Sequence, residues 1–600
     1  GRVVSMQTAT IGAIGVTFET LKATGTVGSG AGVQISNVSG GVFNGGDVSI
    51  AGASNTAIAI QNGTSSTVNF TSATIASASV NGIDVDTGVT GTVTFNTVTI
   101  DNTGSSAVQL LNTSGTVNIN GGSIGATNDP TGSAVLVSGG AATLNVAASL
   151  TKTTAGKIVD IAGVTGGTVT LSGALSANTG SDNGIFVHGN TGGTFNFNGA
   201  MTLGTGTSQA VNLATNLGAT INFAGGMAIS TTSGLGFGAT GGGTINVTGT
   251  NTITSSLAGQ LLVWNGVTVG TSGATFSTMS VTGIVASDAV SLTNVGGGTF
   301  NGGTLSVSGG TNSNGLFLNG TSATINFAKV TIANQTGTAT GGGIRIDNNT
   351  GAVTISDNTS AIGGFGAVQG IGIDINGGSG NVSIAASVSK GTVANNVVQI
   401  SGRTGGTVTL SGTLSADQSV GTANGIDVSN NTGGTITFSG AGSALNTGTT
   451  TAVNLANNTG ATVNFTGGGL AITTTSAIGF NATGGGTINV TGAGNTVQTS
   501  SGQILNWNGV AVGASGVNFS SLQSTASVAG DAINLTGVSG GTFNGGAVTV
   551  AGTSAGGDGI EINASGATFN FASAAVSATA GNGILLSGAN GAVTFTTVTI

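Results

Sequence analysis

A short phrase recurs along the whole chain, and its spacing restricts the fold more than any other feature. It consists of a small residue, then Thr, then alternating apolar and polar residues, as in STVNF ending at Phe70, GTVTF at Phe95 and ATINF at Phe223. With its first apolar residue as a marker, there are 23 occurrences from Phe18 to Val593, spaced by 24 to 31 residues with an average of about 26. A recurring period of this length is the sequence signature of a stacked repeat architecture.

Two further alternating segments follow the phrase in each unit. In one unit, residues 92–95 are followed by 98–100 and 108–110, with Gly, Asn, Ser and Thr between them. Such period-2 segments bounded by turn residues predict three short strands per unit. One unit cannot bury its apolar side alone, whereas stacked units share a continuous interior. We therefore predict an all-β fold, a single parallel β-helix (β-solenoid) with three short strands per coil and about 23 coils of about 26 residues.

Composition excludes several other classes of protein. Gly accounts for 115 residues but Pro for only one, without a Gly-X-Y period, so the chain is not collagen-like. The eight basic residues are scattered, whereas nucleic-acid binding requires clustered cations. No apolar run approaches the roughly 18 residues of a membrane-spanning helix. We expect no nucleic-acid partner and no membrane insertion within this segment.

A second, longer period lies over the first. GGVFNGG around Phe43 recurs as GGTFNGG around Phe300 and Phe543, and the surroundings of Trp264 recur around Trp507. No terminal segment has the polar character of a capping repeat. We predict that residues 1–600 form one continuous solenoid, a section of a longer array. Its super-repeats are approximately 16–273, 274–516 and 517–600, the last being a partial third copy.

The sequences of the repeats are similar to those of a known group of proteins. GGTVTLSG, NGIDVSNNTGGTITFSG, ATVNFTGGGLAITTTS and GGGTINVTG resemble the repeat regions of very large bacterial secreted or surface proteins, such as autotransporter passengers and filamentous-haemagglutinin-like adhesins. The resemblance implies a right-handed β-helix, a hand that crossover connections also favour. It further implies an extracellular or cell-surface location and a structural or adhesive role. It carries over no catalytic residue.

His188 is the only histidine, and it is the first residue to examine for chemistry. Asp182 is the only carboxylate within twenty residues of it in sequence, and Asp160 lies about one coil away. Metal sites need three or four convergent ligands, and a catalytic triad needs a nucleophile as well as an acid. We interpret His188 as a surface residue. Asp558 lies in GGDGIE, a segment that matches a calcium-binding repeat only in part and occurs only once.

Arg345 begins the best candidate for a charged patch. Its equivalent in the next coil is Asp374, and Asp427 lies two coils further, with Asp347 near Arg345 in sequence. These positions fall on the outward column of the third strand. We expect a solvated ladder of charges there, and the alternative is a binding or catalytic patch like those of β-helical polysaccharide lyases and hydrolases.

Two further groups of residues have a structural and a functional interpretation. Trp264 and Trp507 either pack beneath a long loop or are exposed and stack on a sugar. Paired asparagines after the third strand are expected to adopt left-handed turns and to stack as amide ladders. These pairs are 348–349, 430–431 and 457–458.

Three classes of function remain open. We favour a structural or adhesive extracellular rod, forming a fibre, sheath or surface layer by end-to-end or lateral self-association, with surface glycans as possible partners. The first alternative is polysaccharide binding or degradation. The second is ice binding through outward Thr-x-Asn/Thr arrays, such as Thr67 with Asn69, Thr92 with Thr94, and Thr220 with Asn222. We expect no enzymatic activity, and we assign no catalytic, cofactor-binding or metal-binding residue.

Overall fold

The chain divides into two compact units. A computed structural model describes residues 1–180, 182–311, 313–336, 342–363, 368–391, 395–417, 425–588 and 590–600. The first unit comprises Gly1–Gly283 and Asn294–Gly302, and the second comprises Ile284–Thr293 and Gly303–Ile600. The described residues contain strands, turns and bends but no helix. Each unit is a parallel β-solenoid, and the two together contain about 22 turns spaced by about 26 residues.

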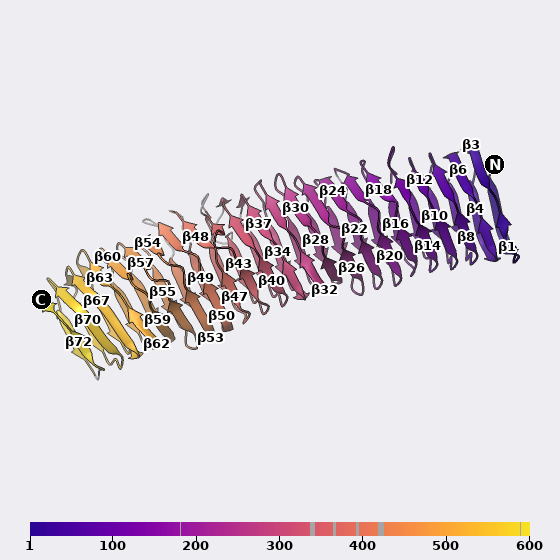
Figure 1. Cartoon of the computed structure of the whole chain (residues 1–600). Coiled ribbons are helices and arrows are strands. Elements are labelled where there is room, and N and C mark those ends of the chain that lie inside the picture. Colours follow the sequence, from indigo (N-terminus) through magenta and orange to yellow (C-terminus); the bar gives the residue numbers. More distant parts are fainter. Residues whose placement is uncertain are drawn as a thin grey trace. The chain divides into compact units, whose positions relative to one another are not determined.

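Each coil of the first unit contributes three strands, and each strand pairs with its equivalent one coil away (Figure 1). One coil contains β8 (Thr67–Phe70), β9 (Ser72–Ile75) and β10 (Ile83–Asp86), and the next contains β11 (Thr92–Phe95), β12 (Val98–Ile100) and β13 (Val108–Leu111). β8 pairs with β11, β9 with β12 and β10 with β13, all in parallel. This confirms the predicted parallel solenoid with three strands per coil, while its handedness stays a prediction.

The second unit repeats this arrangement. One of its coils contains β55 (Val453–Ala456), β56 (Thr462–Phe465) and β57 (Ala471–Thr474), and the next contains β58 (Phe480–Thr483), β59 (Thr487–Val490) and β60 (Thr496–Thr499). These strands again pair in parallel with their equivalents, β55 with β58, β56 with β59 and β57 with β60.

The alternation of the sequence places the apolar residues of each strand inside. In β11, Val93 and Phe95 are fully buried, while Thr92 and Thr94 are half-buried on the outer face. Because successive side chains of a strand point to opposite faces, a shift of one residue would expose the whole apolar set. The apolar columns therefore fix the register of most strands against the next coil, and bulges shift it locally in a few pairs.

Asparagine pairs close the turn after the third strand, as predicted. Asn430 and Asn457 adopt φ of 57°, in the left-handed region that asparagine tolerates. The second members, Asn431 and Asn458, are buried, and Asn431 Nδ2 donates to Asn458 Oδ1 at 2.8 Å. Asn458 Nδ2 in turn donates to the carbonyl of Val428 at 2.8 Å. The turn is thus a buried amide ladder with its hydrogen bonds satisfied.

The two tryptophans lie in the solenoid interior. Trp264 is fully buried in the first unit, with its ring centroid 5.4 Å from that of Phe237 and 5.6 Å from that of Phe300. The hypothesis that an exposed Trp264 stacks on a sugar is therefore wrong, because the inward side of its strand places the indole in the core.

Trp507 repeats this packing in the second unit. It is fully buried, 5.4 Å from Phe480 and 5.5 Å from Phe543 between ring centroids. The sugar-stacking hypothesis is wrong here for the same reason. The recurrence of sequence around the two tryptophans thus produces the same aromatic cluster in each unit. The proposed super-repeat boundaries stay a prediction.

The first marker of the repeat needs a correction. Phe18 follows β2 (Val16–Thr17), and it is Val16 that pairs with Phe43 of β5 (Val42–Asn44). Because the pairing between coils sets the register, Val16 is the residue equivalent to the other markers. The choice of Phe18 as the first marker was therefore wrong by two residues.

Replacing Phe223 by Asp tests the inward columns. Phe223 is 1% exposed and stacks on Phe197 with ring centroids 4.8 Å apart. A carboxylate at this position has no partner, so we expect a loss of at least about 3 kcal/mol in the free energy of unfolding. Urea denaturation followed by far-UV circular dichroism measures the loss, and hydrogen exchange shows whether it is concentrated in the neighbouring coils. Phe223→Leu is the apolar control, and equal stability of the Asp and Leu variants would contradict the inward assignment.

Candidate functional site

The charged column predicted around Arg345 exists in the second unit. Arg345 in β43 (Ile344–Asp347) pairs with Asp374 in β46 (Ile373–Asn376). Asp374 pairs with Gln399, and Gln399 pairs with Asp427, in β49 (Val398–Ser401) and β52 (Ile426–Ser429). The stacking of these residues is therefore confirmed in register.

The environment of this column differs from the expected solvated ladder. Asp374 is only 7% exposed. Arg345 Nε lies 2.8 Å from Asp347 Oδ2 and 3.8 Å from Asp374 Oδ2, and its guanidinium carbon is 5.8 Å from the centre of the Phe317 ring. Burial raises the pKa of Asp374 to about 6, against the opposing effect of Arg345. The expectation of full solvation is wrong for Asp374, because neighbouring side chains on the sheet cover the carboxyl group.

His188 has an acidic partner one coil away. Its Nε2 lies 3.2 Å from Asp160 Oδ1, and Lys157 Nζ lies 3.1 Å from Asp160 Oδ2. The His188 ring stacks on Phe186 with centroids 3.9 Å apart. Asp182, the nearest carboxylate in sequence, instead accepts a hydrogen bond from the amide of Asn183. Within the described part of the chain no hydroxyl group hydrogen-bonds to His188, and the cluster consists of the Lys157–Asp160 ion pair and the hydrogen bond between Asp160 and His188.

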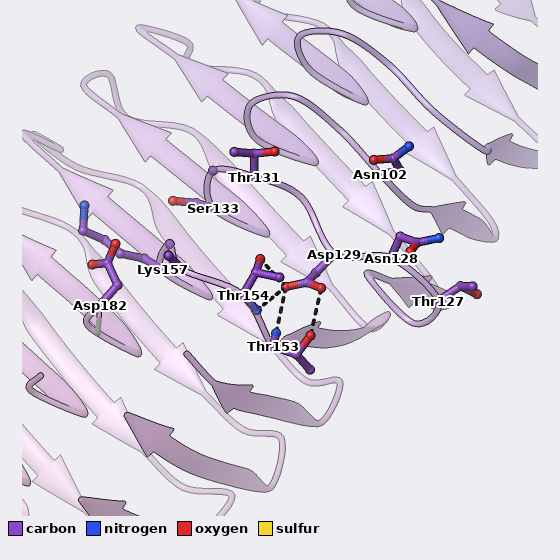
Figure 2. A pocket seen from close by; sticks show the side chains of 13 residues that line it. Asn102, Thr127, Asn128, Asp129, Thr131, Ser133, Thr153, Thr154, Lys157 and Asp182 are labelled. Atoms are coloured by element: carbon purple, nitrogen blue, oxygen red, sulfur yellow. Dashed lines mark hydrogen bonds between the residues drawn. The ribbon is translucent and has the colours of Figure 1, made fainter. Parts of the chain in front are cut away.

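A polar pocket of about 800 Å³ opens on the first unit, where second strands connect to third strands (Figure 2). It lies along four successive connections and is lined by Asn102, Thr127, Asn128, Asp129, Thr131, Gly132, Ser133, Thr153, Thr154, Ala155, Gly156, Lys157 and Asp182. We refer to it as the loop pocket. Sequence reasoning missed it, although its central segment, residues 125–134, is a long connection that contains Pro130, the only proline of the chain.

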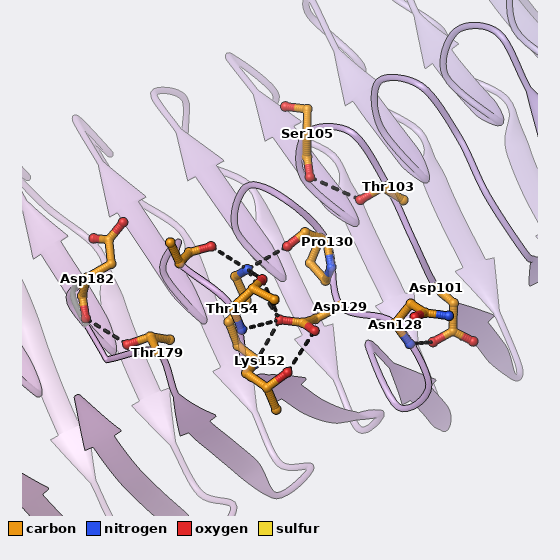
Figure 3. A network of polar contacts seen from close by, with 12 residues as sticks. Asp101, Thr103, Ser105, Asn128, Asp129, Pro130, Lys152, Thr154, Thr179 and Asp182 are labelled. Carbon is orange, nitrogen blue, oxygen red and sulfur yellow. Dashed lines mark hydrogen bonds and ion pairs between the residues drawn. The ribbon is translucent and has the colours of Figure 1, made fainter. Parts of the chain in front are cut away.

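A buried ion pair forms the floor of the loop pocket (Figure 3). Asp129 accepts hydrogen bonds from the amide and hydroxyl groups of both Thr153 and Thr154, at 2.7 to 3.0 Å. Lys152 is fully buried, and its Nζ lies 3.5 Å from Asp129 Oδ2. The ammonium also donates to the carbonyls of Pro130 and Ala155, at 2.5 and 2.7 Å.

Burial and the neighbouring polar groups shift the pKa of Asp129, and likewise that of Lys152, in opposite directions. Partial burial raises the pKa of Asp129, but the hydrogen bonds from Thr154 and Thr153 outweigh it and hold the pKa well below its usual range. Burial lowers the pKa of Lys152, and the charge of Asp129 opposes that effect. The low pKa keeps Asp129 ionised at neutral pH, so that its charge compensates the buried ammonium.

The outer face of the first strands carries a regular polar array. Seven threonines of the first unit occupy one column in direct register. Their hydroxyl groups make no hydrogen bond to other described residues, which leaves them available to water. They are Thr92, Thr116, Thr143, Thr168, Thr194, Thr220 and Thr244.

Asparagines form a parallel column beside these threonines. Asn222 Nδ2 donates to Asn196 Oδ1 at 2.7 Å, and Asn246 Nδ2 donates to Asn222 Oδ1 at 2.8 Å. These bonds link adjacent coils and restrict side-chain movement on this face.

Comparison with known proteins does not assign this chain to a family. No family model, no curated protein and no solved structure matches this chain. Among the described residues, no group of three or more His, Cys, Asp or Glu side chains could hold a metal ion, and no helix is long and apolar enough to cross a membrane.

Removing the charge of Asp374 tests the electrostatics of the second unit. A raised native pKa means that the folded state binds more protons than the unfolded state between about pH 4 and 6, so wild-type stability falls as pH rises through this window. Asp374→Asn should make that fall smaller, leaving the part due to Asp84, Asp288 and Glu561, whose pKa values burial also raises. It should stabilise the protein at pH 7 by roughly 1–2 kcal/mol after allowance for solvent screening. Urea denaturation at several pH values measures both effects.

Asn481→Ala is the matched control, because Asn481 occupies the same third-strand column four coils away from Asp374 and its removal changes no ionisable group. It should keep the wild-type pH dependence. An Asp374→Asn protein with the same pH dependence as the wild type would contradict the assignment.

Proposed function

We propose that this segment is a structural and adhesive extracellular rod that contributes to a fibre, sheath or surface layer. The observation that carries the proposal is the in-register parallel pairing of equivalent strands from coil to coil within each unit. Such pairing gives every coil two neighbours and a shared core, so the fold grows along one direction with each repeat. The proposal assigns the segment no catalytic role.

The distribution of charge supports side-by-side association of such rods. In the first unit, the outward positions of the seven first strands in the threonine column hold only Thr and Asn. Uncharged faces repel one another weakly, so copies can approach without an electrostatic barrier. We propose that self-association uses these faces and leaves the charged third-strand face exposed.

The extracellular location rests on the resemblance of the repeats to bacterial surface proteins. A chain with 4% charged residues and no cysteine is compatible with export and does not depend on disulfides for stability. We propose secretion or display on the cell surface. Immunogold labelling of intact source cells with antibodies against this segment tests the location.

Electron microscopy of the purified segment tests the rod. We expect elongated particles whose length changes by roughly 4.8 Å for each coil, since that is the spacing of stacked strands. A variant lacking residues 168–219, which span two coils between equivalent threonines, should be shorter by about 10 Å and equally wide. Compact particles, or a deletion that changes width instead of length, would overturn the proposal.

Ice binding is a second candidate function, and the uninterrupted threonine column favours it. Seven free hydroxyl groups, with their methyl groups, repeat at roughly 4.8 Å on a face stiffened by the asparagine ladder. Coils of unequal length do not disturb this repeat, because the extra residues lie in the connections. Such an array can hold surface water in a regular lattice.

Thermal hysteresis of the purified segment tests this candidate. Thr168→Lys places a long charged side chain in the middle of the column and should reduce the freezing-point gap several-fold. Ser176→Lys, on the exposed face of the second strand β21 (Leu175–Asn178) in the same coil, is the control and should leave it unchanged. Absence of thermal hysteresis in the wild type would eliminate ice binding.

A further inference from the structure

The loop pocket is held rigid from both sides. The carboxylate of Asp101, in the preceding coil, accepts hydrogen bonds from the amides of Thr127 and Asn128, at 3.0 and 3.3 Å. The carbonyl of Asn128 accepts one from the amide of Asn102 at 2.7 Å. Together with the bonds that Asp129 accepts from the following coil, these contacts fix residues 127–129 before any ligand arrives. A preorganised site avoids the cost of ordering a loop on binding.

The charged groups at the floor of the pocket are paired with other groups of the protein. Asp129 accepts four hydrogen bonds from Thr153 and Thr154 and a fifth, at 3.5 Å, from the Lys152 ammonium. That ammonium lies beneath the surface, where it also donates to carbonyl groups. Lys157 at the rim is paired with Asp160. Asp182 also lines the pocket, where its carboxylate accepts a hydrogen bond from the amide of Asn183. Because the lining includes two carboxylates and its one lysine is paired, the pocket does not favour an anionic ligand.

Five further polar side chains of the wall have no hydrogen-bond partner among the described residues. The side chains of Asn102, Thr127, Asn128, Thr131 and Ser133 make no hydrogen bond to other described residues. Figure 2 shows them around Asp129 on successive connections. Amides and hydroxyls both donate and accept, so this wall suits a ligand that also does both at many points.

We propose that the loop pocket binds a neutral oligosaccharide, an inference that rests on the adhesive part of the proposed function and gives it a site. The volume of about 800 Å³ lies within the range of small-ligand pockets. A sugar offers several hydroxyl groups, each a donor and an acceptor, which matches the free amides and hydroxyls of the wall. The residues lining the pocket include no large apolar or aromatic side chain, so hydrogen bonds carry the recognition.

Saturation-transfer NMR with the full chain tests the site. The probes are cello-, chito-, malto- and manno-oligosaccharides, with oligogalacturonate as an acidic probe. We expect at least one neutral oligosaccharide to give a signal, and the variant Asn102→Ala/Asn128→Ala to bind it about tenfold more weakly, because two sets of hydrogen bonds are lost.

Asn198→Ala is the matched control. Asn198 is an exposed asparagine of the same unit outside the loop pocket, and its removal should not change the affinity. Asp129→Asn serves as a second variant that disturbs the floor rather than the wall. It should weaken binding while the circular dichroism spectrum keeps its β-sheet form.

Three outcomes would overturn the proposal. They are the absence of a signal with every neutral probe, equal binding by the wild type and the double variant, and binding of the acidic probe alone. Electron microscopy of the same preparations separates this failure from failure of the proposed function. Elongated particles without sugar binding would remove the loop pocket and leave the structural rod, whereas compact particles would remove the rod itself.

Discussion

Parallel pairing between equivalent strands of successive coils is the constraint on which the rest of this structure depends. Each inward residue stacks on its counterpart, as Val93 does on Val68 and Val117, and each outward residue does the same. Because a one-residue shift would turn the apolar columns outward, most strands pair without a change of register. Extra residues are accommodated by local bulges, as between Ile245 and Val247 opposite Val269 and Ala274, and by the connections. The long connection 125–134 therefore leaves the flanking strands in register and creates the wall of the loop pocket.

The polar groups inside the solenoid follow from the same geometry. Lys152, Lys390 and Arg403 are each no more than 1% exposed, which removes three of the eight basic residues from the surface. Lys390 donates to the carbonyls of Gln369 and Gly370, and Arg403 donates to those of Gly377, Gly380 and Gly405. Burial lowers the pKa of Lys390 to about 8. Carbonyl groups at the turns thus accept hydrogen bonds from buried cations, while Nε of Arg403 is left without a partner among the described residues.

The solenoid separates its surfaces by chemistry. From Thr92 to Thr244, the outward face of the first strands presents only Thr and Asn, whereas charged residues such as Asp84, Lys157 and Asp160 belong to the third strand and its preceding connection. One face is therefore suited to contact with a neutral, regular partner, and the other to individual polar contacts. The proposed self-association and the proposed sugar site consequently use different sides of the coil and do not compete.

The sequence alone determined the architecture, because strand alternation and a recurring spacing leave one economical way to bury the apolar residues. It also predicted which residues share a column, including Arg345 with Asp374, and the left-handed asparagine turns, since both depend only on the repeat. It did not determine how deeply an outward column residue is buried: Asp374 is covered because of its neighbours. Nor did it reveal the loop pocket, whose residues come from several connections of unequal length. Only the tertiary structure decides which side chains of those connections meet, because their contacts depend on the path of each loop and not on the repeat.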